Sequence, residues 1–496
     1  MRVDSSKANT NKLELHPWCS GPVPRARWVK PVDDQRLSDH VALGALTRTF
    51  PPDLVDAVIE STGKAERRNR LLPARLVVYY VLALSLFSQS GYEEVMRSLV
   101  EGLAWQEEWQ RRWTVPSQPA LTQARARLGP EPLAGLFRVA CVPLATERSP
   151  GAYRFGRRLV SMDGTTLDVP DNEENEEAFG RPGAARGEKA ASPRLRLVAL
   201  AECGTHAMFA AAMGAYSEGE NTLASTLAAS ASPGMLVLAD RGFGGSYELF
   251  ASFAKAGADL CWRVKKNAVL AVHERLSDGS FRSELTTTAQ RKAREQGLQV
   301  RVVEYAIDDP GRPQCEETTY RLVTTVLDPE EAPAVELAAC YAERWDFETA
   351  LDELKNHQRG PRVVLRSKRP DGVRQEAWGL LCTHYAIRVL MADVGDGNGL
   401  DPDRVSFTRV LRAARRSVRA GVATTSVSLT HALGLCRCRD LPVAARAAPS
   451  CCRASRQAQD VELRREALHR SGMADPDHAP SRRGPRSRSL TYWYRG

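Results

Sequence analysis

The spacing of hydrophobic positions divides the chain into a helical part and a part in which strands and helices alternate. In the first part apolar residues recur at helical spacing, with almost no strand-like alternation. Pro51 and Pro52 precede the helix-like run DLVDAVIESTG, which Gly63 ends, in the usual order of proline first and glycine last. The pattern predicts an all-helical domain over residues 37–157, preceded by a polar, proline-containing flexible arm at 1–36.

From residue 158 onward, short apolar runs bounded by Gly, Pro or Asp are typical of strands. The runs are LVSMDGTTLDV, LRLVALAEC, AMFAAAMGA, MLVLAD and DLCWRV. Helices are expected among them, so residues 158–400 are predicted to form a mixed α/β domain. Within it, residues 268–335 hold strand-like pieces without helices between them, which indicates a β-rich insertion. We expect one long helix over 334–357 and further helices to about residue 421.

Charge is concentrated at the C-terminal end. Residues 401–496 hold 19 Lys and Arg against 8 Asp and Glu, while the whole chain has a formal net charge of +9. This basic C-terminal region indicates a polyanionic partner such as DNA. A solvated basic end explains the charge equally well. Residues 407–419 combine arginines with an apolar face, as in an amphipathic helix that faces DNA or a second copy of the chain.

No apolar stretch resembles a secretory signal or a membrane span, so we expect a cytoplasmic protein without a membrane partner. The eleven cysteines lack a regular framework and are expected to be mostly small buried residues. One C-terminal group of cysteines has spacings that fit structural zinc poorly. It comprises Cys436, Cys438, Cys451 and Cys452. The histidines also lack metal-ligand spacing; those considered are His206, His273, His357 and His384.

One face of the predicted helix over 334–357 combines unusual side chains. Tyr341, Arg344, Glu348 and Lys355 fall within about 60° of one another if each residue turns the helix by about 100°. An apolar core stripe does not look like this. A solvent-exposed helix face with an Arg344–Glu348 ion pair would have this composition. For the helix taken alone, that interpretation stays open.

Two aspartates favour a functional reading. Asp163 lies inside an apolar run and precedes Gly164, and Asp240 ends another apolar run. A single Asp-Gly pair usually marks a turn. Two carboxylates on adjacent buried strands repel each other, however, and need a cation between them. With Glu348 from the helix as a third ligand, the set suits one or two Mg2+ ions and phosphodiester cleavage.

Together these motifs resemble those of bacterial insertion-sequence transposases of family four, which carry a Y-x2-R-x3-E-x6-K signature. The signature is complete as Tyr341, Arg344, Glu348 and Lys355, and MDGT and LADRGF resemble the family's two aspartate motifs. The resemblance covers about residues 37–420. It implies an α/β, ribonuclease H-like catalytic core with a β-rich insertion, a helical N-terminal DNA-binding domain and a basic C-terminal region.

The resemblance further implies a metal-binding catalytic triad of Asp163, Asp240 and Glu348 with two Mg2+ ions, for which Mn2+ can substitute. The reaction would be cut-and-paste cleavage and strand transfer at the inverted-repeat ends of an insertion sequence, through hairpin ends. The implied partners are double-stranded DNA with terminal inverted repeats, target DNA and a second copy in a synaptic dimer. The protein would be nucleoid-associated when bound. A related nuclease without strand transfer and a catalytically inactive DNA-binding descendant are the alternatives.

The predicted DNA contacts fall into three groups. Tyr341, Arg344 and Lys355 come from the signature. Arg263 and Lys265 follow a predicted strand, and Arg125 and Arg127 lie on a short helix that could read DNA or merely be exposed. The aromatic residue that would take a flipped base is unassigned, since Tyr305 and Tyr320 lie in no alignable motif.

Overall fold

The computed structural model describes residues 44–68, 70–104, 115–183, 192–293, 295–306, 319–361, 363–398 and 400–420. The predicted arm at 1–36 and the chain beyond residue 420, with its four clustered cysteines, lie outside these residues. Within them, no helix combines the length and the apolar character needed to cross a membrane. The described cysteines are free and buried, as expected; they are Cys141, Cys203, Cys261, Cys340 and Cys382.

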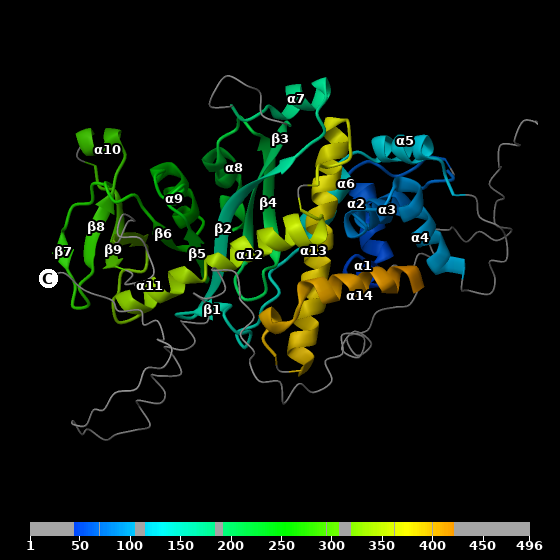
Figure 1. Cartoon of the computed structure of the whole chain (residues 1–496). Helices are drawn as coiled ribbons and strands as arrows, with labels where there is room; N and C mark the ends of the chain where they lie inside the picture. The colour runs from blue at the N-terminus through cyan, green and yellow to red at the C-terminus, as the bar shows by residue number, and fades with distance from the viewer. Residues whose placement is uncertain are drawn as a thin grey trace, which may run out of the picture.

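A single mixed sheet runs through the α/β part of the chain (Figure 1). Its strands are β1 Tyr153–Arg154, β2 Arg157–Asp168, β3 Arg194–Glu202, β4 Met208–Ala215, β5 Met235–Ala239, β6 Asp259–Arg263, β7 Glu274–Arg275, β8 Phe281–Leu285, β9 Leu298–Ala306 and β10 Thr319–Thr324. The order is β4-β3-β2-β5-β6-β10-β9-β8-β7, with β1 paired to β2. Strands β2, β5 and β6 are parallel neighbours and the other pairs are antiparallel. Three antiparallel strands extended by two parallel ones form a ribonuclease H-like core, which confirms the predicted fold class.

The β-rich insertion continues this sheet. Strand β10 pairs with β6, and β9, β8 and β7 follow outward. The insertion also contains helix α10, Thr288–Ala293, so the expectation that it lacks helices is wrong.

Helices cover both faces of the sheet, and strand alternation decides which residues face which helices. Val160 and Met162 of β2 pack in the core with α8 (Glu220–Leu227) and α9 (Tyr247–Lys255). The intervening residues of β2, Leu159, Ser161 and Asp163, therefore face the opposite side. That side is crossed by α11 (Ala334–Ala342) and α12 (Trp345–Asp352) (Figure 1).

The remaining helices form a bundle at one end of the sheet (Figure 1). They are α1 Ala45–Thr49, α2 Pro52–Ser61, α3 Ala74–Leu86, α4 Tyr92–Ala104, α5 Gln118–Leu128, α6 Glu131–Ala140, α13 Pro370–Asn398 and α14 Phe407–Ala420, and the short α7 Glu173–Phe179 lies above β3. Helix α13 stands between the bundle and the sheet and contacts α3 and α6 on one side and β4 and α7 on the other. The first and last described helices thus share one hydrophobic core.

Helix α14 corrects one expectation. Its apolar face, including Phe407, Val410, Leu411 and Val418, is buried against α4 and α13 of the same chain. That face is therefore not available to a second copy.

Candidate active site

Two aspartates lie side by side at the centre of the sheet. The last paired residues of the parallel β2–β5 ladder are Met162 and Ala239, so Asp163 and Asp240 follow on adjacent strands. Neighbouring strands lie about 4.8 Å apart. Asp163 Oδ1 accepts a hydrogen bond from the backbone N–H of Gly164 at 2.7 Å. The predicted adjacency of the two carboxylates is confirmed.

The loop after β5 fixes Asp240. Its Oδ1 accepts from the backbone N–H of Gly242 at 2.8 Å, and Phe243 is buried beneath the loop. Gly244 lies so close to β6 that an added Cβ would come 2.1 Å from the carbonyl oxygen of Arg263. The glycines of LADRGFGG therefore let the chain turn tightly beside the carboxylate.

The segment that carries the signature is not the single α-helix predicted over 334–357. Helix α11 ends at Ala342, α12 begins at Trp345, and residues Glu353–Gln358 form a π-helix. At the junction the backbone bonds tighten to three-residue spacing, as in Arg344 N–H to Tyr341 O at 3.2 Å. A side chain from the sheet contacts this turn. The hydroxyl of Ser161 donates to the Arg344 carbonyl at 3.4 Å.

Despite this irregularity, the signature residues all face β2 and β5. Arg344 bridges two of the three carboxylates, with Nη1 3.2 Å from Asp163 Oδ2 and Nη2 3.4 Å from Glu348 Oε1. The Glu348 carboxylate therefore lies on the same face as Asp163. The Nε of Arg344 is buried and has no hydrogen-bond partner among the residues that the structure describes. The Arg344–Glu348 ion pair of the exposed-surface alternative is present, but the Arg344 side chain is only 10% exposed while that of Glu348 is 42% exposed, so the face is partly buried.

Tyr341 and Lys355 contact the same two strands. The hydroxyl of Tyr341 donates to the carbonyl of Ala239 at 3.3 Å, and the residue is buried. Tyr341 thus holds the backbone next to Asp240, and its predicted contact with DNA stays a prediction. Lys355 Nζ donates to Thr165 Oγ1 at 3.0 Å and remains half-buried on the Asp163 face of β2.

The electrostatics of the site suit a divalent cation. Burial, together with the nearby Asp240 and Glu348 charges, raises the pKa of Asp163 to about 6, although the Gly164 amide and Arg344 oppose the shift. An ionised carboxylate that is held in so unfavourable a place is stabilised by added positive charge. Three oxygen donors without sulfur or imidazole match the ligand preference of Mg2+.

Aromatic residues near the site differ in accessibility. Tyr305 and Tyr320 are buried and stack on each other with ring centroids 5.3 Å apart, and Arg263 lies over Tyr320 at 4.3 Å. Trp345, in contrast, is 41% exposed and sits 5.0 Å from the Arg344 guanidinium. Sequence reasoning passed over this tryptophan. Its position within the signature was the available signal. Lys265 is exposed just beyond β6.

The two arginines predicted to contact DNA from the short helix differ in burial. Arg125 on α5 is buried and donates to Gln375 at 2.8 Å and Glu376 at 3.1 Å, both on α13. The prediction that Arg125 binds DNA is therefore wrong, because its guanidinium ties α5 to α13. Arg127, two residues on, is exposed.

A second group of metal-type side chains lies at the other side of α12. Ligand atoms of His206, Asp346 and Asp403 all lie within 4.8 Å of one another. Arg388 donates to Nδ1 of His206 and also pairs with Glu353. The Nε2 of His206 faces the two carboxylates and lies 3.2 Å from Asp403 Oδ1. We assign the group to a buried network that fixes α12 against α13.

Comparison with known proteins gives concordant matches. The family model "Insertion element 4 transposase N-terminal" matches residues 40–138, and "Transposase DDE domain" matches residues 154–385. The chain is 28% identical over 369 residues to "Transposase InsG for insertion sequence element IS4" of Escherichia coli strain K12, covering 74% of this chain and 80% of that protein. It is 26% identical over 213 residues to "Putative transposase InsZ" of the same strain, covering 43% and 68%.

Similarity extends to solved structures. One is the piggyBac transposase synaptic complex with hairpin DNA, with 12% identity, a TM-score of 0.42, and coverage of 83% of this chain and 87% of that one.

Proposed function

The chain belongs to the insertion element 4 family of DDE transposases, enzymes that cut and join DNA, and on that premise we propose that Asp163, Asp240 and Glu348 are its catalytic, metal-binding residues. The family uses divalent metal, and we infer that two Mg2+ ions act here, with Mn2+ as a substitute. When bound, such ions activate an attacking oxygen and stabilise the leaving oxygen of the phosphodiester.

The observation that carries the proposal is the convergence of three carboxylates from three separate elements. Asp163 comes from β2, Asp240 follows β5, and Glu348 comes from α12, with Arg344 between Asp163 and Glu348. A structural ion pair needs one carboxylate for one arginine. The surplus of negative charge at one edge of two buried strands supports a site built for cations.

In this proposal Arg344 interacts with the carboxylates in one state and with a DNA phosphate in another. Without metal, its guanidinium offsets the charge of Asp163 and Glu348. Cations among the carboxylates would repel it and free its donors for a DNA phosphate, the role that the signature implies. Lys355, Arg263 and Lys265 remain proposed phosphate contacts around the same edge.

We further propose that the enzyme acts on paired inverted-repeat ends as a dimer, joins them to target DNA and passes through hairpin ends. A hairpin end leaves an unpaired base that needs an aromatic surface. Tyr305 and Tyr320 are buried, so the exposed Trp345 is the better candidate for that surface.

The test is cleavage of DNA that carries the element's own ends, which are found in the sequence flanking the gene. Wild-type protein should nick at the repeat boundary with Mg2+ and not with EDTA. Glu348→Gln should bind the same DNA and fail to nick. Asp352→Asn, on an exposed side chain of the same helix, is the matched control and should nick at the wild-type rate. Nicking by Glu348→Gln at the wild-type rate would refute the triad.

A further inference from the structure

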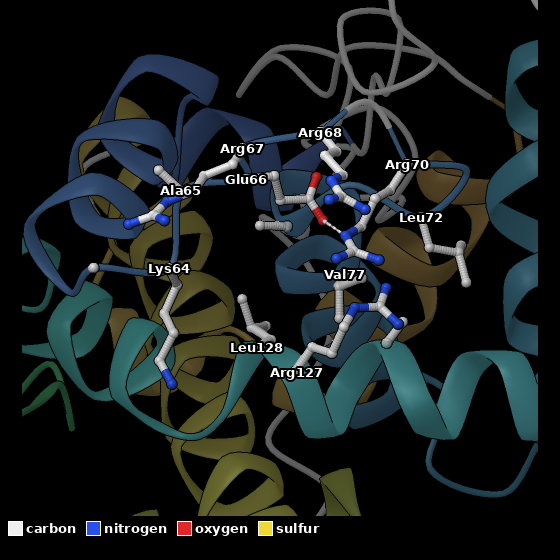
Figure 2. A pocket seen from close by; sticks show the side chains of 13 residues that line it. Lys64, Ala65, Glu66, Arg67, Arg68, Arg70, Leu72, Val77, Arg127 and Leu128 are labelled. Carbon is white, nitrogen blue, oxygen red and sulfur yellow. Dashed lines mark ion pairs between the residues drawn. The ribbon is translucent and has the colours of Figure 1, made fainter.

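A pocket of about 490 Å3 opens in the helical bundle, between the chain segment that follows α2 and the helices α3 and α5 (Figure 2). Five of its lining residues are cationic, and we call the site the basic pocket. They are Lys64, Arg67, Arg68, Arg70 and Arg127. Figure 2 shows these side chains arranged around the hollow, four from the segment and Arg127 from α5.

The positive charge of the basic pocket is largely uncompensated. Glu66 is its one acidic lining residue and lies 3.7 Å from Arg70. Lys64 pairs with Glu131 at 3.2 Å. Within the described part of the chain, Arg67, Arg68 and Arg127 have no ion-pair partner. Exposed arginines normally disperse over a surface. Gathered around one hollow they repel one another, and an anionic ligand would relieve that repulsion.

The floor of the basic pocket is part of the hydrophobic core. Leu72, Val77 and Leu128 line it and are almost completely buried. Gly63, with φ of +69°, lets the chain leave α2 and turn along the rim. Arg127 projects from α5 and the other four cations from the segment that follows α2, so the cations line the opening from two sides. A rim of this kind can be specific for the spacing of anionic groups.

The basic pocket is separate from the carboxylate site. Helix α13 stands between the bundle and the sheet, and the pocket lies on the bundle's helices α3 and α5 (Figure 1). Any ligand of the pocket would thus be held away from the reacting phosphodiester. A DNA duplex meets both conditions, since it is long and carries one phosphate charge for about every 1.7 Å of its axis.

We propose that the basic pocket binds consecutive backbone phosphates of the duplex whose end lies in the active site. The inference rests on the proposed function, since it assumes that this chain binds DNA ends. Arginine suits the task because its planar guanidinium forms two parallel bonds to a phosphate. Contacts of this kind position a duplex without reading its sequence. In this proposal the cations of the basic pocket bind DNA, whereas Arg125, for which the sequence suggested that role, does not.

The experiment measures the salt dependence of DNA binding. Fluorescence anisotropy with a labelled duplex of random sequence is recorded in EDTA from 50 to 300 mM salt, using full-length protein. The pocket variant is Arg67→Ala/Arg68→Ala/Arg127→Ala. Each lost phosphate contact lowers the slope of log K against log salt by about 0.9, so we expect a slope smaller by about 2–3 and binding at least tenfold weaker near 0.1 M.

Two further variants make the result specific. Arg97→Ala/Arg138→Ala/Arg148→Ala removes the same charge from exposed positions outside the pocket and should keep the wild-type slope. Arg67→Lys/Arg68→Lys/Arg127→Lys keeps the charge and should recover most of the slope. Equal losses in the two alanine triples would overturn the proposal, because they would show that only net charge matters. Circular dichroism verifies that all variants are folded.

Two last measurements separate the remaining readings. Inorganic phosphate, titrated against the labelled duplex, should compete no better than chloride of equal ionic strength. Saturable competition by phosphate that the pocket variant abolishes would overturn the proposal in favour of a small-anion site. Asp352→Asn, the control of the nicking assay, should bind the duplex with the wild-type slope. Failure of the carboxylate assignment therefore shows in the nicking assay, and failure of the pocket assignment shows in the slope.

Discussion

Replacing Asp163 by Asn should stabilise the metal-free protein although it removes a proposed metal ligand. Asn has the same shape and keeps the oxygen that accepts from the Gly164 amide. It removes a charge that burial disfavours, since the pKa of Asp163 lies at about 6 against an ordinary 3.8. Each pKa unit corresponds to about 1.4 kcal/mol, so the ionised carboxylate destabilises the folded state by about 3 kcal/mol at pH 8. For a chain of this length that is a few degrees in Tm.

The pH dependence follows from the same pKa. Below about pH 3 Asp163 is protonated in the folded and unfolded states, and the variant gains nothing. Between pH 4 and 6 the folded protein holds the proton more tightly than the unfolded chain does. The Asp163 contribution to the free energy of unfolding therefore decreases with rising pH. Above pH 7 the contribution is constant, and the advantage of Asp163→Asn should be fully developed.

Bound metal should reverse the order of stability, so that the wild type unfolds at a higher temperature than Asp163→Asn. A divalent cation that binds only the folded protein stabilises it in proportion to RT ln(1 + [M]/Kd), and the wild type should gain far more than Asp163→Asn. The assay is thermal unfolding at pH 5 and pH 8, each in EDTA and in MgCl2. Asp352→Asn, on a half-exposed carboxylate, serves as the control and should follow the wild type. Equal Tm values for Asp163→Asn and wild type at pH 8 in EDTA would refute the electrostatic argument, and equal gains from Mg2+ would refute the metal assignment.

Three other outcomes are expected. Arg125→Met should lower the free energy of unfolding by about 3–5 kcal/mol, because it leaves Glu376 buried without its partner. It should not change the salt slope of DNA binding. Denaturant unfolding checks the first expectation and fluorescence anisotropy the second. Tyr341→Phe should slow nicking while DNA affinity stays within twofold, since the lost bond positions Asp240 and touches no phosphate; a salt slope smaller by about one would support the phosphate role. Removal of residues 422–496, which hold 13 arginines against 6 acidic residues, should flatten the salt slope of non-specific binding without unfolding the core, because α14 ends at Ala420. A misfolded truncation by circular dichroism would contradict that expectation.

The irregular segment between α11 and the π-helix shows how the sheet shapes the site. A regular helix would present the signature at fixed angular steps. Here the backbone forms a tighter turn at Glu343 and Arg344, whose carbonyls accept from Cys203 and Ser161. The helix then widens to a π-helix over Glu353–Gln358. π-helical turns occur often at functional sites. The signature spacing is met by local adjustment of the backbone as well as by helical periodicity.

The sequence by itself determined the features that depend on neighbouring residues. Alternation along β2 places Asp163 on the face opposite Val160 and Met162, and the end of an apolar run places Asp240 at a strand terminus. The signature spacing then puts Arg344 and Glu348 on one face of whatever helix carries them. Each of these features follows from periodicity or from a strand end, which are local properties of the chain.

The tertiary structure alone decided which polar side chains are accessible. Arg125 and Arg127 look equivalent in sequence, yet Arg125 is fixed to residues 250 and 251 positions away on α13, while Arg127 lines the basic pocket. The burial of Tyr341 beneath the active-site edge and the exposure of Trp345 four residues on are equally invisible to periodicity. Burial and ion pairing depend on segments that only the folded chain brings together, because a charged group leaves water only where a distant partner replaces its hydration.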